Sequence, residues 1–171
     1  MAKTATYSLI NSTTLGSAQS SVTFSSIPST FTDLVLVCNG GVTIAAANAH
    51  LRFNSDTGSN YSDTNITGTG SAASSGRSTS QTSCILNSYG YPENDMNWNC
   101  IVHIMDYSNT TTYKTLLSRS NQADNGVTNL VGLWRSTAAI TTIDVISIFS
   151  GSPQFSIGTT FKLYGIEAGN L

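Results

Sequence analysis

The chain of 171 residues is poor in charged residues, in strong helix formers and in long apolar runs. Only 9% of its residues are charged, against about 25% in an average soluble domain. Its seven Lys and Arg residues are scattered along the chain, so the clustered basic face of a nucleic-acid-binding protein is missing. No apolar run approaches the ~20 residues that a membrane-spanning helix needs. We therefore expect neither a nucleic acid nor a membrane as partner.

Cysteine is also scarce, and its spacing excludes two common uses. Cys38, Cys84 and Cys100 are odd in number and include no Cys-x-x-Cys pair, which argues against a disulfide framework and against a zinc knuckle. Each lies beside aliphatic residues, so we interpret all three as small buried apolar side chains. The first seven residues, MAKTATY, lack the apolar core of a signal peptide. We expect the chain to be made and kept in a cytoplasm until it assembles.

Neutral hydrogen-bonding residues are abundant instead. Ser, Thr, Asn and Gln number 26, 24, 15 and 4, which makes 69 of the 171 residues. Ser, Thr and Asn side chains compete with helical hydrogen bonds and so disfavour helices. The hydrophobic share of 39% is still enough to form a core. The length predicts a single domain over residues 1–171.

Short runs of alternating apolar and polar residues, bounded by Gly, Asn, Asp or Ser, predict β-strands along the whole chain. In the longest run, Thr141, Ile143, Val145, Ser147 and Phe149 form the more apolar set, which we expect to face the core. Many short strands without a helix predict an all-β fold, an antiparallel β-sandwich of the jelly-roll type. The expected strands are 6–11, 20–24, 33–38, 50–53, 61–67, 82–86, 99–105, 113–119, 128–134, 141–149 and 161–166.

Two stretches show no alternation. Residues 67–82 read TGTGSAASSGRSTSQT, with three glycines and a single charge, Arg77. We interpret them as a long, exposed Ser/Gly-rich loop inside the domain. Residues 88–97, SYGYPENDMN, contain Pro92 and two acids and predict a second loop.

Residue types that support catalysis are few and not grouped. His50 and His103 both fall on predicted strands, and we interpret them as partly buried structural residues. The Gly-x-Ser-x-Gly motif of a nucleophile elbow is not found. We expect no enzymatic activity and no cofactor. The acids close in sequence lie in loop-like contexts, where solvated carboxylates are the simplest interpretation: Asp56 with Asp63, and Glu93 with Asp95.

The most specific local motif is the run RFNSDTGSNY, which begins at residue 52. Asn54, Asp56 and Asn60 alternate around Gly58 in this run, and oxygen ligands at such spacing can bind Ca²⁺. The run lacks the additional acids and the terminal Glu of an EF-hand loop. A turn in which Asn and Asp side chains bond nearby backbone groups explains the same residues. We favour the turn and keep Asn54, Asp56 and Asn60 as a calcium candidate.

Aromatic residues suggest a possible glycan contact. Tyr89 and Tyr91 lie in the predicted loop 88–97, and exposed aromatic faces present apolar area together with a polar group. Trp134 lies in the apolar run LVGLW, so we expect it in the core instead. Tyr89 and Tyr91 are therefore the candidates for binding a sugar.

A series of motifs resembles a known group of proteins. The most specific part is RFN-x-D-x-G-x-NYS within residues 51–62. In order along the chain, these pieces resemble small virion structural proteins of tailed bacteriophages, notably marine and cyanobacterial phages. The other pieces are IPSTFTDLVL at 27–36, GLW at 132–134, TAAIT at 137–141 and LYGI at 163–166.

The resemblance implies a non-enzymatic β-sandwich on a phage particle. It is compatible with a capsid decoration (cement) protein, often a homotrimer, that binds and stabilises the major capsid protein shell. The alternative is a receptor-binding or fibre-tip component of the tail that binds a host surface glycan. The expected strands run along the whole chain and leave no stretch for a fibre shaft. We expect from this a decoration protein or a tip assembled on a separate chain, and of the two we favour decoration. Because charges are scarce, we expect attachment through a few aromatic and aliphatic anchors, with little dependence on salt.

Overall fold

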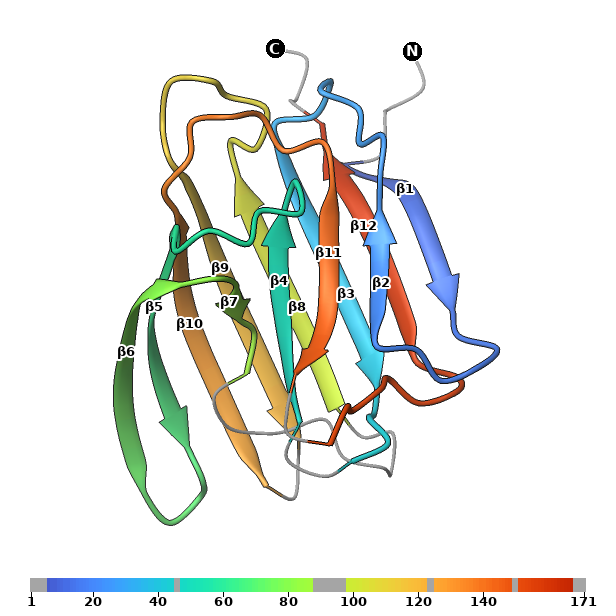
Figure 1. Ribbon diagram of the computed structural model, residues 1–171, viewed down its shortest axis with the longest axis vertical. Helices are drawn as coiled ribbons and strands as arrows, with labels where there is room; N and C mark the ends of the chain where they lie inside the picture. The colour runs from blue at the N-terminus through green and yellow to red at the C-terminus, as the bar shows by residue number, and fades with distance from the viewer. Residues whose placement is uncertain (1–5, 45–46, 88–97, 123–124, 149–150, 168–171) are drawn as a thin grey trace.

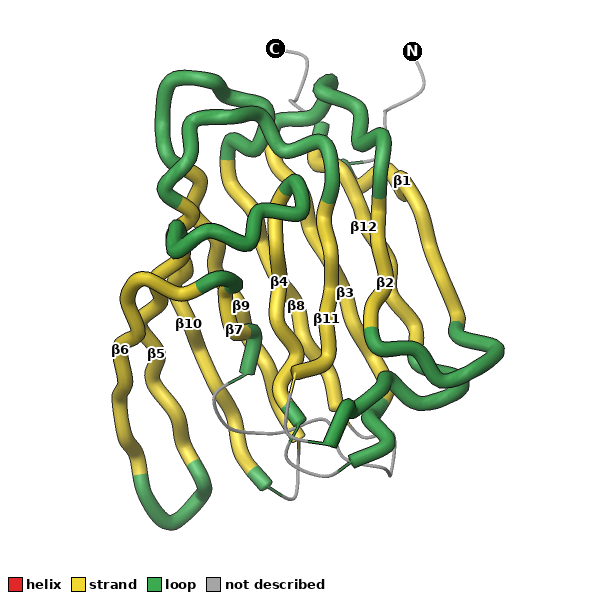
Figure 2. Tube along the Cα trace, viewed as in Figure 1, coloured by secondary structure: helices red, strands yellow, loops and turns green. Residues whose placement is uncertain are grey.

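The computed structural model describes residues 6–44, 47–87, 98–122, 125–148 and 151–167. These residues form antiparallel strands in two sheets that face each other (Figure 1), joined by turns and loops (Figure 2). They include no helix long and apolar enough to cross a membrane. The strands are β1 (Tyr7–Thr14), β2 (Ser21–Phe24), β3 (Asp33–Gly40), β4 (Asn48–Phe53), β5 (Tyr61–Gly68), β6 (Ala73–Gln81), β7 (Cys84–Ile85), β8 (Trp98–Met105), β9 (Lys114–Gln122), β10 (Gly126–Trp134), β11 (Ile143–Ile148) and β12 (Thr160–Ile166).

The strand order is that of an enlarged jelly roll. The smaller sheet has the order β2-β11-β4-β7, and the larger has β1-β12-β3-β8-β9-β10-β5-β6. An eight-stranded jelly roll consists of two four-stranded sheets. Here the smaller sheet corresponds to one of them, and β3, β8, β5 and β6 of the larger sheet correspond to the other. The larger sheet is widened by the β9–β10 hairpin, inserted between β8 and β5, and by the β12–β1 pair beside β3. The predicted all-β antiparallel sandwich is confirmed.

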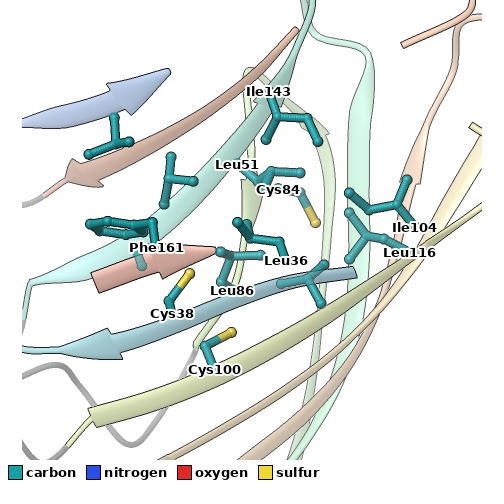
Figure 3. Close-up of a cluster of buried hydrophobic side chains, with 14 of the residues drawn as sticks. Leu36, Cys38, Leu51, Cys84, Leu86, Cys100, Ile104, Leu116, Ile143 and Phe161 are labelled. Carbon is teal, nitrogen blue, oxygen red and sulfur yellow. The ribbon is translucent and has the colours of Figure 1, made fainter. Parts of the chain in front are cut away.

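The core lies between the two sheets. Figure 3 shows Leu36 and Cys38 of β3 directed toward Leu51 of β4 and Ile143 of β11, on the opposite sheet. On β11, Ile143, Val145 and Ser147 are buried and the residues between them are not, as the alternation predicts. Thr141 precedes the strand and is exposed, which corrects its expected inward position, and Phe149 lies outside the described residues. All three cysteines are buried and free, and burial raises the pKa of each thiol. The interpretation of these cysteines as core side chains is therefore confirmed.

The prediction of a loop over residues 67–82 is wrong for most of that segment. Residues 73–81 form β6, which pairs with β5, and the turn that joins the two strands is confined to 69–72. The sequence gives no alternation there because β6 lies at the edge of the sheet, and none of its side chains is buried. Backbone pairing with β5 holds the strand, so it needs no apolar face.

The two sheets approach each other closely at Gly132, on the inner side of β10. A Cβ atom at this position would lie 2.5 Å from Cys84 Sγ on β7 and 3.0 Å from the Leu116 side chain. Both neighbours are buried in the core. The absence of a side chain at residue 132 therefore lets β7 pack against β10.

Gly132→Ala is expected to destabilise the protein. The added methyl group overpacks a buried site, which costs about 1–3 kcal/mol. Chemical denaturation measures the change in the free energy of unfolding. Gly16→Ala is the matched control, because a Cβ there meets nothing within 4 Å, and its effect should stay within about 0.5 kcal/mol. Equal stability of the two variants would contradict this account of the sheet contact.

Candidate functional site

A groove lies on the outer side of the eight-stranded sheet, away from the core. It has a volume of about 400 Å³ and is lined by outward side chains of β5, β8, β9 and β10. We call these side chains the outer face. They are Thr64, Ile66, Ile101, His103, Leu117, Arg119, Asn129 and Val131.

The centre of the outer face is apolar. Leu117 and Val131 are directly opposite each other on β9 and β10, where facing side chains are in contact range. Ile101 on β8 and Ile66 on β5 lie one row away, next to Arg119 and Asn129 respectively. These four aliphatic side chains are each 43–63% exposed. A contiguous exposed apolar patch on a folded protein typically marks an interaction surface.

The apolar surface continues across the next strands of the sheet. Val37 on β3 is opposite Ile101, and Val35 is opposite His103. Tyr164 on β12 is in turn opposite Val35, and Leu9 on β1 is opposite Tyr164. Aliphatic and aromatic side chains therefore lie on the outward side of these strands too, with Val35 buried among them and His103 interrupting the row.

Arg119 places one positive charge within this apolar surface. Its neighbours across the strands are Ile101 and Asn129. Among the described residues, no carboxylate lies within ion-pair distance of its guanidinium group, since the only such pair joins His103 to Asp33. Arg is one of the residue types enriched at the energetic centres of protein interfaces.

Neither histidine belongs to a catalytic triad in the described part of the chain. His103 Nε2 lies 3.0 Å from Asp33 Oδ2, and Asp33 Oδ1 accepts the backbone N–H of Asp106. His50 Nδ1 lies 2.9 Å from the Ser83 hydroxyl. One histidine thus has an acid partner and the other a serine partner, and they lie on different sheets. Within the described residues, these contacts do not bring the three groups of a nucleophilic triad together.

His50 is partly buried, and this shifts its titration. Burial, with a smaller contribution from the Arg52 guanidinium, lowers the pKa of His50 to about 4. An unfolded chain binds a proton at His50 near pH 6.5, whereas the folded protein does so only near pH 4. The neutral imidazole is therefore the form that fits the folded structure.

The stability of the protein is expected to fall as the pH falls from about 6.5 to 4, because only the unfolded chain protonates His50 over this range. The loss from this group approaches about 3 kcal/mol at the lower end. His50→Gln removes the titration and should flatten this part of the profile. Urea denaturation of both proteins at a series of pH values measures the difference. Parallel profiles would contradict the assignment, since all other titrating groups are shared.

The RFNSDTGSNY motif connects two loops of the fold. Asn54 Oδ1 accepts the backbone N–H groups of Thr141 and Thr142, and its Nδ2 donates to the carbonyl of Ala139. The segment between β4 and β5 is thereby attached to the segment that leads into β11. The motif that carries the family resemblance thus has a structural role.

Asp56 is the centre of the same motif. Its Oδ2 accepts the Trp134 Nε1–H at 2.7 Å and the Asn60 Nδ2–H at 2.8 Å, and its Oδ1 accepts the Gly58 backbone N–H. Burial raises the pKa of Asp56, but these three hydrogen bonds outweigh burial and hold the pKa below its usual value. Trp134 is buried, as expected, and stacks on Tyr61.

The side-chain oxygens of Asn54 and Asp56, two of the three residues proposed as calcium ligands, thus already accept hydrogen bonds. Asn54 and Asp56 direct their side-chain oxygens at N–H groups, which a cation would have to displace. The described residues also contain no group of three or more His, Cys, Asp or Glu side chains that could hold a metal ion. The geometry of Asn54, Asp56 and Asn60 favours the turn.

Asp56→Ala is expected to lower the free energy of unfolding by about 2–4 kcal/mol, because it leaves the Trp134 N–H without its acceptor. The loss should be the same in calcium and in EDTA, as measured by thermal and urea unfolding. Asp144→Ala is the matched control, since Asp144 accepts only the exposed hydroxyls of Thr23 and Ser55. A melting temperature of the unmodified protein that rises with calcium would instead support the metal site.

The remaining predicted site residues lie elsewhere. Tyr89, Tyr91, Glu93 and Asp95 fall outside the described residues. Asp63 is buried on β5, apart from the Asp56 turn, and burial raises its pKa.

Sequence reasoning missed the outer face, although a signal for it exists. Three strands contain adjacent apolar residues, Ile101-Val102, Leu116-Leu117 and Leu130-Val131. Because successive side chains of a strand point to opposite sides, each pair places one apolar residue in the core and the other outside. Pairs of this kind on neighbouring strands predict a sheet that is apolar on both sides.

The chain matches no protein-family model, and no curated protein sequence matches it.

Proposed function

We propose that this chain is a non-enzymatic structural protein of a phage virion, a decoration protein that attaches to the capsid through the outer face. The observation that carries the proposal is the exposed apolar surface of Ile66, Ile101, Leu117 and Val131 with the unpaired Arg119 among them. The order of the sequence motifs supports a virion protein. In this function the major capsid protein is the partner, and the virion is the location.

The chemistry of the outer face specifies the chemistry of its partner. Burial of exposed aliphatic side chains stabilises the contact by about 25 cal/mol for each Å² of apolar area removed from water. Arg119 has no acid partner within the described chain, and burying it unpaired would be costly. The complementary surface must therefore be apolar with a carboxylate opposite Arg119.

A receptor-binding role has less support. It rests on Tyr89 and Tyr91, which lie outside the described residues. The outer face presents aliphatic side chains rather than the aromatic rings on which sugars stack. We therefore propose decoration of the capsid as the function.

Val131→Asp is expected to weaken attachment at least tenfold, because it places an unpaired charge at the centre of an apolar contact. Co-sedimentation of the purified protein with capsids that lack it measures the affinity. Ile157→Asp is the matched control, since Ile157 is 65% exposed and lies outside the outer face. Unfolding curves of both variants establish that the fold is kept. Binding by Val131→Asp at the unmodified affinity would contradict the proposal.

The role of Arg119 is tested in the same assay. Arg119→Glu should abolish attachment by placing two carboxylates together, whereas Arg119→Lys should retain part of it, since an ammonium group keeps the charge but loses the bidentate geometry. Attachment of the unmodified protein should change little with salt, because one charge pair contributes beside a larger apolar area. A steep loss of binding with rising salt would indicate a mainly electrostatic contact instead.

A further inference from the structure

The β6 strand forms an open edge of the eight-stranded sheet. It pairs with β5 on one side only. In Figure 1 the β5–β6 hairpin extends beyond the four-stranded sheet, and no other described strand runs along its free side. An edge of this kind presents a row of backbone N–H and C=O groups, which another extended chain can pair with.

β6 lacks most features that keep strand edges from pairing. Proteins protect their edges with proline, lysine, bulges or very short strands. β6 is nine residues long and contains no proline, no lysine and one charge, Arg77. Residues 73–78 pair with β5 in unbroken register, and the irregularity lies beyond them, toward Gln81. Their remaining side chains are those of Ala, Ser and Gly, which allow close approach of another strand.

The opposite edge of the sheet is different. β1 contains an irregularity within its length, between Leu9 and Asn11, and bulges of this kind disrupt pairing. Its side chains at Tyr7 and Leu9 are large and exposed. β6 therefore offers the longer regular edge, with unbroken pairing over residues 73–78 against 11–14 on β1.

We propose that β6 pairs with β6 of a second copy of this chain, antiparallel, across a two-fold axis normal to the sheet. Self-pairing satisfies both free edges at once and forms a closed dimer, whereas pairing between β6 and β1 would leave an open edge for further copies. The small side chains of Ser74, Ser75 and Gly76 suit the centre of this contact. A register centred on Gly76 places Arg77 opposite Ser75 and so keeps the two guanidinium groups from facing each other.

This assembly extends the proposed function without depending on it. A two-fold axis normal to the sheet keeps the outer faces of both copies on the same side. The dimer would then present two copies of the attachment surface, and binding through both raises the overall affinity. The homotrimer that the resemblance implies is a different assembly, and the measured mass distinguishes the two.

The test uses the purified full chain without any particle, so its outcome is independent of capsid attachment. Light scattering after size exclusion should give twice the monomer mass of 18.0 kDa. Ser75→Lys adds charge at the paired edge and should raise the dimer dissociation constant at least tenfold. Ser71→Lys is the matched control, because residue 71 lies in the turn before β6, and this variant should remain dimeric. A monomer, a trimer, or a dimer that Ser75→Lys leaves unchanged would overturn the proposal.

Cysteine cross-linking provides a second readout that does not require disruption of the contact. The three native cysteines are buried, so a cysteine introduced at an exposed position of 73–79 is the reactive one. Oxidation should link two chains efficiently at one or two neighbouring positions and poorly elsewhere along β6. Equal linking at all positions, or none at any, would contradict a defined β6–β6 register.

Discussion

The two sheets differ in width, and the rest of the structure depends on this difference. A sheet with an apolar side must bury it against another layer, but here four strands cover eight. The core is therefore concentrated where both sheets are present, around Leu36, Leu51 and Ile143 (Figure 3). Toward the open edge the inner side of β5 becomes polar, with Asp63, Asn65 and Thr67. β6, beyond it, has no buried side chain.

The sequence predicts the parts of this fold in which one side of a strand is apolar. Alternation identifies β11 and its buried residues, and the scarcity of helix formers predicts the all-β class. β6 escapes prediction because backbone pairing with β5 and a polar contact between Ser74 and Thr67 hold it, without any buried apolar side chain. The predicted strand 82–86 shortens to β7, Cys84–Ile85. The hydrogen bond between Asp56 and Trp134 joins residues 78 apart, and a local pattern carries no information about such a distant partner.

The candidate site follows from the same architecture. Adding β9 and β10 to the jelly roll provides the strands that carry Leu117, Arg119 and Val131 on their outward side. The polar residues of the most specific motif are used within the fold, where Asn54 and Asp56 hold two loops together. In the proposed function, the motif stabilises the sandwich while a different, largely aliphatic surface makes the contact with the partner. The low charge of the chain is consistent with such a contact.

The most direct test of the proposed function is the copy number of this chain in purified phage particles. Quantitative mass spectrometry gives its ratio to the major capsid protein. A decoration protein should be present in hundreds of copies, in a fixed ratio to the shell subunit. A few copies for each particle would place the chain at the tail or at a vertex, and absence from the particle would contradict a virion role altogether.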